Sequence, residues 1–279
     1  MLIRCWGARG SIPVSGEQYL KYGGDTTCLE IRTRSGELVV VDAGSGIRAL
    51  GKEVHQQGVR SIHLIFTHAH LDHVMGFPFF RPIYSKGVRI ELYGCPFAQG
   101  SVEGMLARTM SPPSFPVKYE DISALVCPHK DCTQRFTVGG IDVFPVLLSH
   151  PNQGIGYRFT ENGRSFVFLT DNELTHVHPG GLKYEDYRAF AKGADLLIHD
   201  SEFTADEYKT TKTWGHSVYT DALRLALEAG VGRFGLFHHN QDRSDAAVDA
   251  MVQDCRRIVS EKGARMECSA VAAGSVFEL

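Results

Sequence analysis

Four side chains of metal-binding types lie within six consecutive residues of this chain, in the stretch FTHAHLDHVMGF at positions 66–77. They are His68, His70, Asp72 and His73. The first two histidines are two positions apart, so they point to the same side of an extended segment. The aspartate and the last histidine are adjacent and diverge as the chain enters a helix. One short segment can therefore offer two ligands to one metal ion and two to another.

Imidazole and carboxylate together suit Zn²⁺, and also Mn²⁺ or Fe²⁺. A predicted strand at 62–66 leads directly into the histidines. Rigid scaffolds present reactive side chains on loops at the ends of strands, so this position suits a functional site. The alternative is a surface loop that is rich in histidine by chance. Four ligand-type residues at this spacing, after an apolar strand, favour the metal site.

Short apolar runs and helical patterns alternate along the rest of the chain. The apolar runs predict strands at 2–5, 29–34, 38–42, 62–66, 88–93, 141–148, 156–160, 165–170, 195–199 and 233–237. Helical patterns cover 46–57, 101–109, 184–191, 218–229 and 244–261. Interleaved strands and helices predict an α/β layered protein. Because α/β proteins of 279 residues are often one unit, we expect a single domain over residues 1–279.

The charge balance gives little reason to expect polyanionic partners. The chain has 29 basic and 32 acidic residues, a net charge of −3. That balance leaves no electrostatic footprint for generic binding to nucleic acids or anionic membranes. The amino terminus does not have the pattern of a signal peptide, and no run approaches the roughly 18 apolar residues of a membrane helix. We therefore expect a cytoplasmic protein without a membrane span.

The cysteines are seven in number, scattered, and expected to be reduced thiols. The stretch CPHKDC, with Cys127, His129 and Cys132, could form half of a small zinc site. No second pair of ligands lies nearby in the sequence, so a surface loop is the better interpretation.

The segment THAHLDH resembles the H-x-H-x-D-H signature of the metallo-β-lactamase superfamily, and the resemblance extends over nearly the whole chain. It implies a four-layer αββα sandwich with a dinuclear metal site at one edge of the sheets. The remaining motifs of the family are matched by His150 in LLSHPNQGIGYRF, Asp171 in FVFLTDNE and His238 in FGLFHHN. A shift of one residue would exchange His238 for His239. We favour His238, which aligns with the single histidine of the THFSP-type motif in ribonuclease Z-like proteins.

The resemblance also assigns ligands to two divalent transition-metal ions, Zn or Mn, with Fe as a further option. The first ion would be held by His68, His70 and His150. The second would be held by Asp72, His73 and His238. Asp171 would bridge the two ions.

A second pair of motifs indicates which branch of the superfamily the chain resembles. The stretch LLIHDSEFTADEYKTTKTWGHSVYTDA resembles the HEATF and GHST elements of ribonuclease Z-like phosphodiesterases, with Asp200 at the Glu position and His216 in Gly-His-Ser. His70 stands where the di-iron electron-transfer members carry Glu, which favours a hydrolase. In such an enzyme a metal-bridging hydroxide, oriented by Asp72, would attack the phosphodiester. His216 would donate a proton to the leaving group, with Asp200 holding its tautomer.

The spacing of the motifs bears on the substrate. Ribonuclease Z carries a flexible, basic arm for transfer RNA between its second and third metal motifs, but here only 20 residues separate His150 from Asp171. We therefore expect a small phosphodiester substrate, above all a cyclic nucleotide, and no nucleic acid partner. Phe77, Phe79, Phe80 and the loop MSPPSFP are candidates to contact its sugar or base, with core packing as the alternative.

Several alternatives stay open at this point. They are a tRNA 3′-processing endonuclease like ribonuclease Z, a cyclic ribose phosphate phosphodiesterase, a hydrolase of thioesters or lactones, and a non-catalytic metal-binding sensory module. Related enzymes are often dimers, and a homodimer stays open as well.

Overall fold

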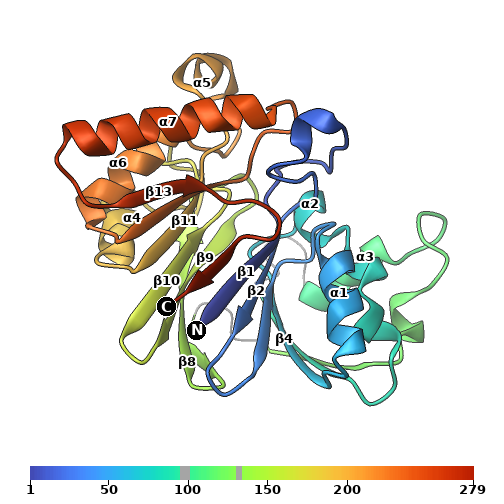
Figure 1. The fold of residues 1–279 in the computed structure, drawn as a ribbon. Coiled ribbons are helices and arrows are strands. Elements are labelled where there is room, and N and C mark those ends of the chain that lie inside the picture. Colours follow the sequence, from blue (N-terminus) through green and yellow to red (C-terminus); the bar gives the residue numbers. More distant parts are fainter. Residues whose placement is uncertain (95–100, 130–133) are drawn as a thin grey trace.

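The computed structural model describes residues 1–94, 101–129 and 134–279, which form four layers (Figure 1). Two β-sheets face each other, and helices cover the outer face of each sheet. The predicted four-layer α/β sandwich is therefore confirmed. Cys132 of the CPHKDC pattern lies outside the described residues.

The first sheet is built mainly from the amino-terminal half of the chain. Its strands lie in the order β14 (Val276–Glu278), β1 (Leu2–Gly7), β2 (Cys28–Arg32), β3 (Leu38–Val41), β4 (Ser61–Ile65), β5 (Arg89–Tyr93) and β6 (Leu125–Pro128). Strands β3 to β6 run parallel, whereas β14, β1, β2 and β3 pair in antiparallel fashion. The strand from the carboxyl-terminal end of the chain thus completes the edge beside β1.

The second sheet comes from the carboxyl-terminal half. Its strands lie in the order β13 (Glu267–Ala270), β12 (Arg233–Phe237), β11 (Leu196–Asp200), β10 (Arg164–Leu169), β9 (Gly154–Glu161), β8 (Ile141–Leu148) and β7 (Phe136–Val138). Strands β10 to β13 run parallel, and β7 to β10 form an antiparallel meander.

Helices supply the crossovers that parallel strands require. Over the first sheet lie α1 (Ile47–Gln56) and α3 (Val102–Thr109), and the short helix α2 (Leu71–Val74) lies at the ends of its strands. Over the second lie α4 (Tyr184–Ala191), α6 (Tyr219–Ala229) and α7 (Asp245–Glu261), with α5 (Ala205–Thr211) beyond them. Short 3₁₀ turns occupy Glu17–Tyr19, Phe77–Phe79, Arg81–Tyr84 and Tyr119–Asp121.

Alternating side chains of the strands pack into different layers of the core. In β10, Phe166 and Phe168 face the other sheet, whereas Val167 and Leu169 face the helices. In β3, Val39 joins the core between the sheets, and its neighbours pack under the helices of the first sheet. Successive side chains of a strand point to opposite faces, so strands that are apolar throughout are buried on both sides.

The carboxyl ends of several strands meet at one edge of the sandwich. Strands β3 and β4 run parallel in the first sheet, and β10, β11 and β12 run parallel in the second. Strand β8 has the same direction as β10, because both are antiparallel to β9. The loops that follow these six strands carry the candidate site, as expected for open α/β sheets.

No helix within the described parts of the chain is long and apolar enough to cross a membrane.

Candidate metal centre

All seven predicted metal ligands lie together at this edge of the sheets. The segment after β4 supplies His68, His70, Asp72 and His73. His150 follows β8, Asp171 follows β10 and His238 follows β12. The chain thus brings residues up to 170 positions apart into one cluster.

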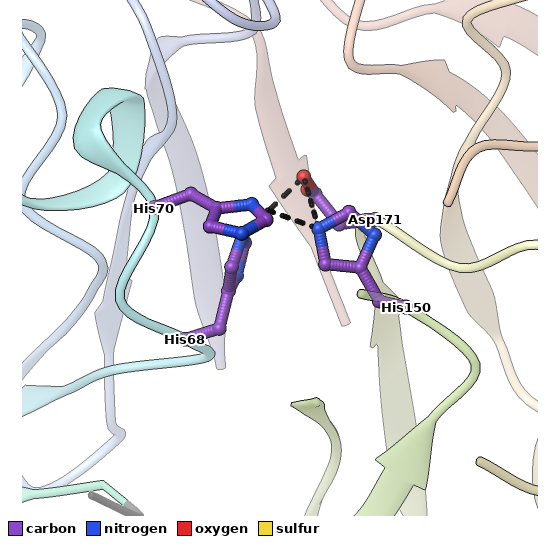
Figure 2. Close-up of side chains that lie close together, drawn as sticks. All are labelled: His68, His70, His150 and Asp171. Carbon is purple, nitrogen blue, oxygen red and sulfur yellow. Dashed lines mark hydrogen bonds and ion pairs between the residues drawn. The ribbon is translucent and has the colours of Figure 1, made fainter. Parts of the chain in front are cut away.

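One group of side chains consists of His68, His70, His150 and Asp171, whose ligand atoms lie within 4.8 Å of one another (Figure 2). His150 Nε2 is 2.9 Å from His70 Nδ1. Asp171 Oδ2 is 3.5 Å from His68 Nε2 and 3.7 Å from His150 Nε2. The four side chains point toward a common centre, as the ligands of a metal ion do.

The second group consists of Asp72, His73, Asp171 and His238, again within 4.8 Å of one another. His73 Nε2 lies 3.4 Å from Asp72 Oδ2 and 3.2 Å from Asp171 Oδ1. His238 Nε2 lies 3.3 Å from an oxygen of each aspartate. Asp171 is the one member of both groups, so its carboxylate lies where a bridging ligand would.

Two buried nitrogens at the centre of the site lack a hydrogen-bond partner among the described residues. They are Nε2 of His68 and Nε2 of His73, whose side chains are almost fully buried. A buried polar atom without a partner carries a free-energy penalty, so such an atom in a native structure calls for an unseen partner. Imidazole nitrogens that converge with carboxylates fit divalent transition-metal cations. The residues present therefore fit two metal ions.

Hydrogen bonds on the far side of the rings fix which nitrogen faces the centre. His73 Nδ1 donates to Asp42 Oδ2 at 2.8 Å, and His68 Nδ1 donates to Thr67 Oγ1 at 3.0 Å. The Thr67 hydroxyl in turn donates to Asp42 Oδ2 at 2.7 Å. Because each Nδ1 carries the proton, each Nε2 keeps its lone pair for a metal, as in other outer-shell supports of metal-binding histidines.

The histidines of the second sheet have similar supports. His150 Nδ1 donates to the Gly215 carbonyl at 2.9 Å, and His238 Nδ1 donates to Glu202 Oε2 at 2.9 Å. Gly215 has a φ of +98°, and a Cβ there would lie 2.2 Å from His150 Nδ1. Only glycine therefore permits the carbonyl to approach this ligand.

The charges of the site are arranged to receive cations. Burial lowers the pKa of His68 well below its usual value and that of His150 to about 3, so both imidazoles stay neutral. Burial also opposes charge on His73 and His238, but the surrounding carboxylates, Asp171 and Asp72 among them, together outweigh burial and raise the pKa of both. These ring nitrogens thus lie in a strongly negative field, which a metal cation would neutralise.

Asp200 and His216 lie directly beside the ligand cluster. His216 Nδ1 donates to Asp200 Oδ2 at 2.7 Å, and the His216 ring stacks on that of His238 at 4.7 Å. Burial lowers the pKa of His216, but the nearby carboxylates of Glu202 and Asp200 raise it to about 9. Glu202 Oε2 is 3.4 Å from His216 Nδ1, and it is a site residue that the sequence analysis missed.

Three consecutive residues just after β10, at positions 171–173, organise much of the site. Asp171 is the shared ligand, and the next residue, Asn172, accepts from the Ser149 amide at 2.9 Å beside His150. Glu173, which is 1% exposed, accepts from His178 Nε2 at 2.7 Å and from the Gly215 amide at 2.9 Å. Neither Asn172 nor Glu173 was predicted.

The amino-terminal segment GARGS also reaches the site. The Ser11 amide donates to Asp72 Oδ2 at 2.9 Å, and a Cβ on Gly10 would lie 2.4 Å from His238 Nδ1. The buried guanidinium of Arg9 donates to backbone carbonyls at Gly23, Asn240 and Arg243 and so anchors this segment. The close approach of the backbone to His238 explains why glycine stands at position 10.

Three site residues have backbone angles that favour glycine. Asp42, Asp171 and His238 have φ values of 62°, 48° and 58°. Such conformations cost free energy for residues with a side chain and cluster at functional sites. The turns that place these side chains at the centre are therefore held by the surrounding packing and hydrogen bonds.

The other candidate residues do not join the ligand cluster. His239 is buried, but its Nε2 donates to the Val271 carbonyl at 2.8 Å, so it points away from the cluster. Phe77 and Phe80 are fully buried in the core, whereas Phe79 is 55% exposed.

The chain has recognisable relatives. The β-lactamase superfamily domain matches residues 38–239. Ribonuclease Z of Oceanobacillus iheyensis is 23% identical over 245 residues, which cover 71% of this chain and 78% of that protein. The metallo-β-lactamase fold protein YhfI of Bacillus subtilis superimposes with a TM-score of 0.70 at 19% identity, over 100% of this chain and 98% of the other. A diphosphatase from the PhnP family superimposes with a TM-score of 0.68 at 18% identity, over 100% and 97%.

Removing the shared ligand should disturb both metal positions. We expect the purified protein to bind about two transition-metal ions per chain, and Asp171→Ala to lower the occupancy of both. Elemental analysis after dialysis measures the metal content, with the exposed Asp206→Ala as the control. Undiminished occupancy in Asp171→Ala would rule out the bridging role.

Asp42, the buried carboxylate that accepts from His73 Nδ1, offers a second test. The Asp42→Asn amide can donate to His73 Nδ1, which selects the tautomer whose Nε2 carries the proton and cannot bind metal. We expect metal affinity to fall about 10–100-fold, the usual cost of losing such a partner. Metal titration against a chromogenic chelator gives the affinity. The control is Asp195→Asn, which alters a carboxylate far from the site and should bind metal like the wild type. If Asp42→Asn also binds metal like the wild type, Asp42 has no part in metal binding.

Proposed function

This chain belongs to the β-lactamase superfamily, and from that membership we propose that it is a metal-dependent phosphodiesterase that cleaves RNA in the manner of ribonuclease Z. A metal-dependent hydrolase of phosphodiesters is the coarser assignment that the family and its ribonuclease Z relatives support. One observation carries the proposal beyond a generic metal site. The His216 imidazole, held by Asp200, lies against histidines of both ligand groups.

The metal ions would be held by the two groups that share Asp171, with zinc or manganese as the proposed ions. When bound, such a pair supplies a nucleophile at neutral pH by acidifying water and neutralises charge on the phosphoryl oxygens. The protein's own part is to fix the ligands. Asp72 does so with one oxygen, Oδ2, held by the Ser11 amide at 2.9 Å and facing His73 and His238.

His216 is proposed as the proton donor to the leaving oxygen. Its Nδ1 proton is committed to Asp200, so Nε2 is the atom that carries a transferable proton. Its ring lies 5.2 Å from that of His150 and 4.7 Å from that of His238. A donor in that position can reach a leaving group on a phosphate held between the two ligand groups.

The relatives change the expected substrate. We expected a cyclic nucleotide and no nucleic acid partner, but the curated relative from O. iheyensis is named ribonuclease Z, and this favours a phosphodiester bond in RNA. We therefore rank RNA first. The net charge of −3 means that affinity for RNA would come from local groups rather than from the whole surface.

A small phosphodiester such as a cyclic nucleotide stays the second candidate, because of one structural feature. Strands β9 and β10 pair from Glu161 with Arg164 and are joined by the two residues Asn162 and Gly163. No basic arm for transfer RNA is inserted between His150 and Asp171. An enzyme of this branch without that arm loses a source of affinity for transfer RNA.

A substrate panel separates the two candidates. Metal-loaded protein would be incubated with precursor tRNA, a single-stranded RNA, cyclic mononucleotides and cyclic ribose phosphate. We expect cleavage of RNA at a rate that exceeds turnover of the cyclic compounds. Turnover of cyclic nucleotides alone would reverse the ranking, and no cleavage of any phosphodiester would overturn the proposed function.

The proton donor is tested by its dependence on the leaving group. His216→Ala should leave metal content nearly intact and slow cleavage of RNA by about 10²–10⁴-fold, the span of general acid catalysis. A p-nitrophenyl phosphodiester needs little protonation and should be affected far less. Asp200→Asn should fall between wild type and His216→Ala, because it disturbs the tautomer without deleting the donor.

Single-turnover rates on both substrates, in metal-matched proteins, provide the measurement. His55→Ala, at a position outside the site, is the matched control and should behave like wild type. An equal loss on both substrates would mean that His216 positions the substrate or the metals and is not the donor.

A further inference from the structure

An apolar groove of about 470 Å³ opens beside the ligand cluster, between the loop after β4 and helix α3. Two of its lining residues, Ala69 and Leu71, flank the ligand His70. The others include Phe79, Met105, Arg108 and Phe115. The groove and the metal centre thus share one stretch of backbone, so part of a substrate held at the metals could extend into the groove.

The groove exposes large apolar side chains. Leu71 is 64% exposed and Phe79 is 55% exposed, although the neighbouring Phe77 and Phe80 are fully buried. The Phe79 and Phe115 rings meet edge to face, with centroids 5.6 Å apart and an interplanar angle of 84°. This contact packs the edge of one ring against the face of the other. A groove lined mainly by apolar side chains next to a reactive site is a candidate to hold part of its substrate.

Arg108 is the charged residue in the lining of the groove. It lies near the end of α3 and forms no ion pair with any carboxylate among residues 1–94, 101–129 and 134–279. A guanidinium group pairs with phosphate oxygens and stacks on planar rings. A cation beside a site for a phosphodiester complements the charge of that substrate.

We propose that this groove binds the nucleobase of the nucleotide next to the scissile phosphate, with Phe79 as the stacking platform and Arg108 contacting a phosphate or the base. The proposal rests on the proposed function and narrows its substrate to phosphodiesters that carry a base. An exposed aromatic ring together with an arginine is the combination that binds unpaired bases in single-stranded nucleic acids. An uncharged lipid or peptide chain would make no use of the Arg108 guanidinium.

Equilibrium binding to metal-loaded His216→Ala protein, which should turn over RNA slowly, isolates the groove from catalysis. The probes are a fluorescein-labelled single-stranded RNA and the same RNA with one abasic residue, moved along the chain in a series. A second pair, adenosine monophosphate and ribose 5-phosphate, used as competitors, tests whether a free mononucleotide occupies the same place.

Adding Phe79→Ala to this protein should weaken binding of the normal RNA about 5–150-fold, the range for loss of one base–aromatic stack. In the abasic series, one RNA should lack the base that the groove binds. Phe79→Ala should leave the binding of that RNA unchanged. Phe79→Leu should be intermediate, because it keeps apolar contact but loses the flat ring. Arg108→Gln should weaken binding and reduce its dependence on salt. Val276→Ala, at a position 52% exposed on β14, and Arg34→Gln in the β2–β3 turn are the matched controls.

The proposal is overturned if Phe79→Ala and its parent protein bind the normal RNA equally well. It is also overturned if no abasic position lowers the affinity as Phe79→Ala does. A wild-type dimer that Phe79→Ala converts to monomers without a change in RNA binding would make the groove an interface between copies and would also overturn it. If the proposed function is wrong, the substrate panel will show no cleavage. The binding measurements do not depend on cleavage, so the two failures can be told apart.

Discussion

One buried carboxylate holds the two ligand groups together. Asp171 is 2% exposed, lies within 3.7 Å of His68, His73, His150 and His238, and has backbone angles that favour glycine. A buried carboxylate is costly unless hydrogen bonds or cations compensate for it. The Thr170 hydroxyl, which donates to Asp171 Oδ1 at 2.6 Å, and the cations that the imidazoles are arranged to bind provide that compensation. The turn after β10 can persist only because the rest of the site satisfies this one charge.

The sequence predicts the parts of the site that are encoded locally. The histidines and aspartate of residues 68–73 are visible because their spacing within one segment is itself a signal, and the three distant ligands follow from a resemblance to known motifs. Asp42, Glu202 and Glu173 were missed. Each acts by a hydrogen bond to a residue at least 31 positions away, and no spacing in one sequence records such a contact.

In the fold, too, long elements with a clear local pattern could be predicted, whereas short elements could not. The long strands and helices were predicted to within a few residues, as for the helix expected at 218–229 and found at Tyr219–Ala229. The strands β6, β7, β13 and β14 were missed, because three or four residues at or near a sheet edge carry too little pattern. Helix α5 was missed as well, although the capping box formed by Thr204 and Glu207 is a usable signal in the sequence TADE.

The metal ligands come from both sheets, and this has a consequence for the cohesion of the whole molecule. The segment after β4 continues the first sheet, whereas His150, Asp171 and His238 follow strands of the second. A bound cation is therefore a noncovalent cross-link between two halves that otherwise adhere mainly through apolar side chains. A ligand that binds only the folded state stabilises it by mass action, by about 2.7 kcal/mol at one hundred times its Kd. The concentration of free metal ions therefore contributes to the free energy that holds the two sheets together.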